Sequence, residues 1–204
     1  MSNDINLYMV NAKYVRNLMN AEKRTSKENR CNTILSISPQ RNKQGRPYVG
    51  IIVVANDRKY CIPLCSADEK KKYENMRENI TMRKIRDDDN KVIGILNINN
   101  MIPVRDEYLE LFDIEIHAED TEKQIEFKKT CAAELKWCRD HLSEIERFAK
   151  NLYEIVCSDV AFGKRSICPH YEALEKECDK GKKLPKRSVQ KQNKRNQQKS
   201  KRHG

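Results

Sequence analysis

The sequence lacks long apolar runs and contains little histidine. No stretch approaches the roughly 20 apolar residues that a membrane-spanning helix needs, and the first residues lack the basic patch and apolar run of a secretion signal. We therefore expect a cytoplasmic protein. Histidine, the usual acid–base side chain near neutral pH, occurs only four times, as His117, His141, His170 and His203. The chain thus offers little material for an active site built on paired histidines.

Acidic residues are missing from the C-terminal end. Residues 181–204 hold ten Lys and Arg and no Asp or Glu, whereas residues 1–180 hold 31 basic and 30 acidic residues. The end segment also has only Leu184 and Val189 as aliphatic residues, too little apolar surface to offset the entropy cost of ordering. We predict one domain over residues 1–180 and a disordered basic tail over residues 181–204. This tail would be either a solvated terminus or a non-specific binder of phosphates.

The eight cysteines show no metal-binding pattern. They are scattered through apolar segments, and even Cys168, His170 and Cys178 lack the closely paired ligands of a closed zinc site. The acidic run Asp87–Asp89 is not followed by the further oxygen ligands that a calcium loop requires. We interpret the cysteines as small buried hydrophobic residues in a reducing compartment, and we predict no metal and no cofactor.

The first half of the chain contains the strand patterns. Two apolar runs, 46–54 and 59–66, are separated by the short polar turn 55–58, which predicts a β-hairpin. Gly50 suggests a bend or bulge in the first of these strands. Further strands are expected at residues 7–10 and 94–104.

Helical patterns lie on both sides of these strands. Asn11 is a suitable N-cap for a helix with Tyr14, Val15 and Leu18 on one face, and the polar stretch 20–32 is expected to be its exit. From residue 121 to 157 the apolar residues form one helical stripe. Because this stripe is long, we predict two helices with a break between residues 140 and 143.

Three motifs occur in a fixed order along the strands. They are RPYVGI from Arg46, KYxxPLxS from Lys59 and GxLNxNxMIPV from Gly94. Their order and spacing resemble the ToxN/AbiQ family, the RNA-cleaving toxins of type III toxin–antitoxin systems. The resemblance is close over residues 7–104 and looser beyond them. It implies an α+β fold with a compact, strongly bent antiparallel β-barrel-like core, similar to the Kid/MazF toxins, and peripheral helices.

The resemblance also implies a function. The expected activity is that of a sequence-preferring, metal-independent endoribonuclease that cleaves single-stranded RNA to 2′,3′-cyclic phosphate and 5′-hydroxyl ends. The expected partners are a repetitive pseudoknot RNA antitoxin, in a heteromeric protein–RNA assembly, and cellular or phage RNA as substrate in phage defence. No protein antitoxin and no membrane partner are expected. The alternative is an RNA-binding protein without catalysis.

Such a reaction needs a base for the ribose 2′-hydroxyl, cationic donors for the phosphate and an acid for the leaving 5′-oxygen. The resemblance offers Tyr14, Arg46 and Ser66 as catalytic residues. Arg46 would clamp the phosphate, Ser66 would donate a hydrogen bond to it, and Tyr14 would orient groups or move a proton. Ser66 also fits a helix N-cap with Glu69, and Tyr14 fits a core aromatic residue. The general base stays open, with Lys59, Lys70 or the geometry of the substrate itself as alternatives, because arginine holds its proton too tightly.

Further candidates for RNA contact are mostly basic residues near these motifs. Cys65 is included because it stands beside Ser66, where relatives have a hydroxyl. The set comprises Lys13, Arg16, Lys43, Lys59, Cys65, Lys70, Arg83, Lys84 and Arg86.

Overall fold

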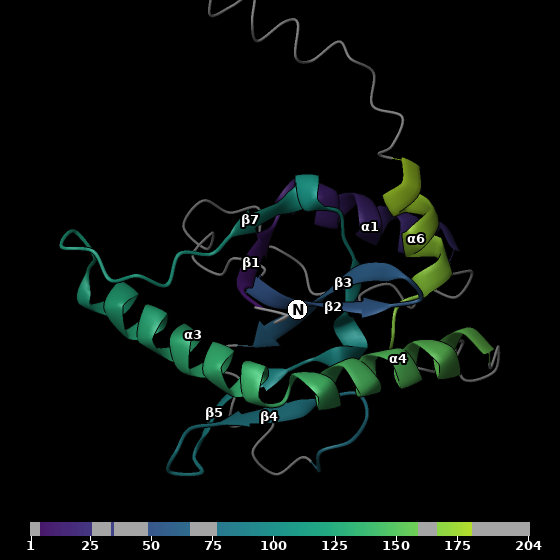
Figure 1. Cartoon of the computed structure of the whole chain (residues 1–204). Helices are drawn as coiled ribbons and strands as arrows, with labels where there is room; N and C mark the ends of the chain where they lie inside the picture. The colour runs from purple at the N-terminus through teal and green to yellow at the C-terminus, as the bar shows by residue number, and fades with distance from the viewer. Residues whose placement is uncertain (1–4, 26–33, 35–48, 66–76, 159–166, 181–204) are drawn as a thin grey trace, which may run out of the picture.

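The computed structural model describes residues 5–25, 34, 49–65, 77–158 and 167–180, and Figure 1 shows their arrangement. The elements are, in order, β1 (Leu7–Val10), α1 (Ala12–Thr25), β2 (Val49–Ala55), β3 (Arg58–Cys65), β4 (Arg83–Arg86), β5 (Val92–Leu96), the 3₁₀ turn η3 (Ile98–Asn100), β6 (Ile102–Pro103), the 3₁₀ turn η4 (Asp106–Tyr108), β7 (Leu109–Leu111), α3 (Glu122–Asp140), α4 (Leu142–Ser158) and α6 (Tyr171–Lys180). None of these helices combines the length and apolar character needed to cross a membrane.

The strands form one seven-stranded antiparallel sheet in the order β4-β5-β3-β2-β1-β7, with β6 paired to β3. One edge of β3 pairs with two strands. Tyr60 and Cys61 pair with β6, and Leu64 and Cys65 pair with β5. The α+β prediction is confirmed, whereas the predicted barrel is wrong. The sheet stays open because its edge strands β4 and β7 are short and pair with different neighbours, and helices cover both faces instead.

Alternating residues of the strands build two cores. Ile51, Val53 and Tyr60 belong to a buried cluster with residues of α3 and α4. Cys61 and Ile102 point to the other face and join a second cluster with residues of α1 and α6. In Figure 1, α3 and α4 accordingly run along one side of the sheet, and α1 and α6 lie together on the other.

The predicted hairpin is confirmed as β2 and β3. Its turn is two residues long, because Ala55 pairs with Arg58, and Asn56 and Asp57 both have positive φ, 51° and 53°. Two such residues match the twist of the flanking strands, which favours a tight hairpin. Of the bend or bulge expected at Gly50, the bulge is wrong, since pairing is regular through this residue. Gly50 is required for close approach instead, because a Cβ there would lie 2.2 Å from the Ile62 carbonyl oxygen.

The expected start of the first helix and the expected break in the long helical stripe are confirmed, whereas the end of the first helix differs. Asn11 Oδ1 accepts hydrogen bonds from the Lys13 and Tyr14 backbone N–H groups, at 3.0 and 3.1 Å, which confirms the N-cap. The helix does not end near Asn20, as expected from its polar sequence, but continues to Thr25 because its inner face remains buried. The long stripe divides as predicted: α3 ends at Asp140 and α4 begins at Leu142.

The prediction that the cysteines are buried hydrophobic residues is confirmed for most of those that the structure describes. Seven are free thiols, of which six are buried and Cys157 is half-buried. Burial raises the pKa of the Cys61 and Cys138 thiols well above the usual range. Cys31 lies outside the described residues.

Candidate functional site

The end of β3 is held in place by the residue that follows β5. Asn97 donates a side-chain hydrogen bond from Nδ2 to Cys65 Sγ, and its backbone N–H donates to the Pro63 carbonyl oxygen at 3.1 Å. Asn97 and Cys65 are both buried, at 4% and 7% exposure. Cys65 is the last described residue before Ser66. The strand therefore ends at a fixed position immediately before the predicted catalytic serine.

Two more buried asparagines follow in η3. The Asn99 backbone N–H donates to the Thr81 carbonyl oxygen at 2.9 Å, and its side chain donates to the Ile167 carbonyl oxygen at 3.3 Å. Asn100 closes the turn on Asn97 through a 3.1 Å backbone hydrogen bond. These asparagines join the β5–β6 connection to the segments before β4 and α6. Their role was not predicted from the sequence, although the polar run within the third motif was the available signal.

Tyr14 lies on the inner face of α1 and is 4% exposed. Its hydroxyl donates a 2.7 Å hydrogen bond to the Pro103 carbonyl oxygen, and its ring stacks on Tyr108 with centroids 4.0 Å apart. Burial raises the pKa of this hydroxyl far above its usual value. Such a group can orient the strand to which it is bonded, whereas moving a proton would first require breaking this contact. Its catalytic role stays a prediction.

The remaining catalytic candidates, Arg46 and Ser66, lie outside the described residues, as do Lys43 and Lys70. The structure therefore does not bring the predicted catalytic set together. Their roles stay predictions.

The other basic candidates differ in their availability. Lys13 and Arg16 are exposed on α1. Lys59 is half-exposed and forms a 2.6 Å ion pair with Asp106. These three side chains can all reach a ligand at the surface.

The candidates on β4 are more enclosed. Arg83 forms an ion pair with Glu144 and lies 4.1 Å from the centre of the Phe148 ring. Lys84 is 8% exposed. Arg86 donates a 2.9 Å hydrogen bond to the Asn90 carbonyl oxygen. All three residues thus already have partners within the fold.

A pocket of about 270 Å³ opens on the sheet face that also carries α1. Its lining residues are Tyr8, Ile52, Lys59, Asp106 and Leu109. The floor is apolar and comes from adjacent strands, while the Lys59–Asp106 ion pair supplies charge. This pocket combines apolar side chains with one ion pair. Among these residues, only Lys59 is a candidate predicted from the sequence.

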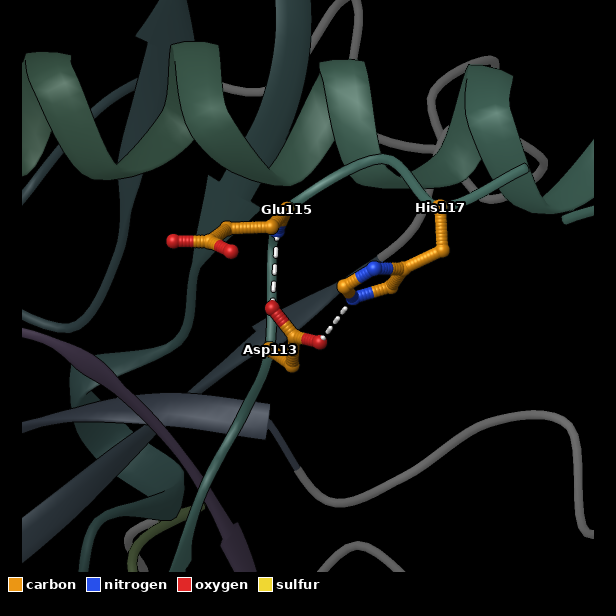
Figure 2. Close-up of side chains that lie close together, drawn as sticks. All are labelled: Asp113, Glu115 and His117. Atoms are coloured by element: carbon orange, nitrogen blue, oxygen red, sulfur yellow. Dashed lines mark hydrogen bonds and ion pairs between the residues drawn. The ribbon is translucent and has the colours of Figure 1, made fainter. Parts of the chain in front are cut away.

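One group of potential metal ligands lies on the extended segment between β7 and α3, as Figure 2 shows. The ligand atoms of Asp113, Glu115 and His117 lie within 4.8 Å of one another, and all three residues are exposed. His117 Nε2 is 2.7 Å from Asp113 Oδ2. This hydrogen bond raises the pKa of His117 and lowers that of Asp113. Because the two side chains already satisfy each other, we assign no ligand to them.

The fold is that of toxins from type III toxin–antitoxin systems. One solved structure, of a bacterial type III toxin selectively inhibited by a non-coding RNA pseudoknot, aligns with a TM-score of 0.69 and 19% identity, covering 88% of this chain and 99% of that chain. AbiQ, a lactococcal anti-phage endoribonuclease of a type III system, aligns with a TM-score of 0.68 and 18% identity over the same shares.

Sequence comparison gives the family. The family described as toxin ToxN, type III toxin–antitoxin system, matches residues 6–179, so the chain belongs to the ToxN family. Endoribonuclease ToxN of Bacillus thuringiensis subsp. kurstaki is 27% identical over 144 residues, which are 67% of this chain and 69% of the relative. The resemblance found in the three sequence motifs is thereby confirmed.

Proposed function

We propose that this protein is an endoribonuclease toxin that cleaves single-stranded RNA with sequence preference. Membership of the ToxN family over residues 6–179 carries the proposal. Two relatives are named as endoribonucleases, which supports the same activity here. Since its substrate and inhibitor are both RNA, we place its action in the cytoplasm.

In the proposed reaction the ribose 2′-oxygen attacks the adjacent phosphorus and the bond to the 5′-oxygen breaks. The products are a 2′,3′-cyclic phosphate and a 5′-hydroxyl, with no metal ion required. Because the nucleophile belongs to the substrate, the protein has to position the phosphate and stabilise its growing negative charge. Arg46 and Ser66 take these roles in the proposal.

The described part of the chain supports this arrangement indirectly. Asn97 fixes the strand end that leads to Ser66 through its contacts with Cys65 and Pro63. Tyr14 takes the orienting role, because its hydroxyl holds the Pro103 carbonyl oxygen. Both residues would therefore act on the position of the site rather than on the reacting atoms.

We further propose that a repetitive pseudoknot RNA inhibits the toxin in a protein–RNA assembly and that the pair serves phage defence. The likeness in fold to a toxin inhibited by an RNA pseudoknot supports the inhibitor. The likeness to an anti-phage endoribonuclease supports the biological role.

The test uses purified, RNA-free protein and an RNA substrate in excess EDTA, with end-group analysis of the products. Cleavage should persist and leave cyclic phosphate and 5′-hydroxyl ends. Activity that needs magnesium, or products with 5′-phosphates, would contradict the proposed chemistry.

A Ser66→Ala variant should lose cleavage, and Ser143→Ala is the matched control because Ser143 is an exposed serine on α4. Melting curves of both variants exclude loss of folding as the cause. If Ser66→Ala is folded and fully active, Ser66 is not part of the site. If no preparation cleaves RNA yet all bind it, the protein is an RNA-binding protein without catalysis.

A further inference from the structure

The outer face of α1 carries only cationic and amide side chains. The exposed residues on this face are Lys13, Arg16, Asn17, Asn20, Lys23 and Arg24. At 3.6 residues per turn these positions fall on one side of the helix. The opposite side, with Val15 and Leu18, is buried in the core shared with α6.

This face differs in charge from the other helices that the structure describes. The only acidic residue of α1 is Glu22, which is 5% exposed. The other three described α-helices each present an exposed acid among their cations, namely Glu126 on α3, Glu154 on α4 and Glu172 on α6. The outer face of α1 is therefore unmixed positive charge with neutral amides.

Three of its cations are available for a ligand. Arg24 forms a 3.0 Å ion pair with Glu177 of α6. Lys13, Arg16 and Lys23 form no ion pair with any residue that the structure describes. The ten helical steps from Lys13 to Lys23 span about 15 Å of helix. This length covers several phosphates of a nucleic acid strand.

The helix that carries these cations is held firmly at both ends. At its start Asn11 caps the first turn, and Tyr14 is bonded to Pro103 at 2.7 Å. At its end Arg24 is paired with Glu177. The cations thus sit on a rigid support, so that binding orders only their side chains and costs little further entropy.

The composition of the face favours folded RNA over an unpaired strand. Proteins that hold single strands stack bases on exposed aromatic rings. The only aromatic residue of α1 is Tyr14, which is 4% exposed and faces the core. Lysine and arginine contact phosphates, and the amides of Asn17 and Asn20 can contact 2′-hydroxyls, which are the groups that a folded RNA displays in its shallow groove.

We propose that the outer face of α1 binds the backbone of a folded RNA and is a recognition surface for the inhibitory RNA. The inference rests on the proposed function in one respect, namely that the inhibitor is RNA. It assigns the inhibitor, rather than the substrate, to this surface.

The test compares two triple variants with equal loss of charge. Lys13→Ala/Arg16→Ala/Lys23→Ala removes the α1 cations, and Lys123→Ala/Lys129→Ala/Lys150→Ala removes exposed lysines of α3 and α4. The probes are an RNA hairpin and an unstructured oligouridine of equal length. The oligouridine is 2′-O-methylated throughout and the hairpin only in its loop, so that neither single-stranded part can be cleaved while the hairpin stem keeps its 2′-hydroxyls. Affinity is measured across a series of salt concentrations. Cleavage of an unmodified single-stranded RNA is measured in parallel.

The α1 variant should bind the hairpin at least tenfold more weakly. The slope of its log affinity against log salt concentration should become less steep by about two to three. The control variant should change hairpin affinity less than threefold. Oligouridine binding should weaken to the same small extent in both variants, because each loses three positive charges. Equal losses of hairpin affinity would overturn the proposal, since only net charge would then matter. Loss of oligouridine binding and cleavage in the α1 variant would instead assign the face to the substrate.

The two proposals fail separately in this design. If no variant cleaves RNA but only the α1 variant loses hairpin affinity, the catalytic proposal fails and the surface stands. If cleavage is normal and both variants bind the hairpin equally well, the proposal for the α1 face is overturned and the catalytic proposal stands.

Discussion

At the residue scale, the hydroxyl of Tyr14 links α1 to the sheet. It reaches the Pro103 carbonyl oxygen, 89 residues further along the chain, at a buried position. A buried carbonyl that loses its donor costs free energy, because water cannot replace the donor. The hydrogen bond therefore contributes both to stability and to the position of α1.

Replacing Tyr14 with Phe tests this role. We expect the free energy of unfolding to fall by about 1–2 kcal/mol, measured by urea denaturation, because the Pro103 carbonyl loses its donor while the ring packing is kept. The cleavage rate should fall far less than in Ser66→Ala. Tyr8→Phe serves as the control, since Tyr8 is half-buried in β1 and should shift stability by less than about 0.5 kcal/mol. Unchanged stability with abolished cleavage would instead identify Tyr14 as a catalytic residue.

Asn97 is a second residue that holds distant segments together through buried hydrogen bonds. Its side chain contacts Cys65 and its backbone contacts Pro63, both near the C-terminal end of β3. Sulfur is a weak hydrogen-bond acceptor, so the backbone contact and the burial of Asn97 supply much of the restraint. A hydroxyl in place of the thiol would accept the same hydrogen bond more strongly.

At the element scale, α6 is anchored by one buried carboxylate. Glu175 is 8% exposed. Its Oε1 accepts a 2.7 Å hydrogen bond from the Tyr60 hydroxyl and lies 3.6 Å from Arg58 Nε, while Oε2 accepts from the Tyr153 hydroxyl at 3.4 Å. Arg58 adds two 2.9 Å hydrogen bonds to Asp179 on the same helix. These contacts join α6 to the hairpin and to α4.

Substituting Glu175 with Ala should loosen this anchor. We expect a loss of about 2–3 kcal/mol in the free energy of unfolding, because the buried Tyr60 hydroxyl loses its charged acceptor. Glu172→Ala is the matched control, as it removes an exposed carboxylate from the same helix. Hydrogen exchange should also speed up in α6 of the Glu175 variant and stay slow in β2. Equal stability of the two variants would show that α6 is held by its apolar face alone.

At the scale of the whole molecule, the positive charge is concentrated at one end of the sequence. Residues 1–180 are nearly balanced, with 31 basic against 30 acidic residues, and residues 181–204 add ten cations. Within the described residues many cations are already paired with carboxylates, among them Arg58, Arg83 and Lys128. We therefore propose that the tail dominates non-specific attraction to RNA, while the domain supplies recognition and cleavage.

Deleting residues 185–204, which contain eight Lys and Arg, tests this division. Non-specific RNA binding should weaken and depend less steeply on salt, because fewer counterions are released. The melting temperature and the pattern of cleavage sites should not change. A full-length variant with these eight cations replaced by Gln should behave in the same way. Equal salt dependence of the intact and truncated proteins would contradict the prediction.

The sequence by itself determined the features that depend on neighbours a few residues away. The hairpin turn within residues 55–58, the Asn11 cap and the break between α3 and α4 are such features, because backbone dihedrals, capping side chains and helical periodicity act locally. The ordered motifs also gave the family, since their spacing is a property of the sequence alone.

Only the tertiary structure decided how distant segments meet. The sheet stays open, Gly50 serves close approach to Ile62, and the buried candidates Tyr14 and Lys84 are enclosed by the fold. The contact of Tyr60 with Glu175 joins residues 115 positions apart. Local patterns carry no information on such contacts, because they form when several elements pack together and exclude water at once. For the same reason, Asn97 could be identified as a support of the β3 end only after β3 and β5 had been placed side by side.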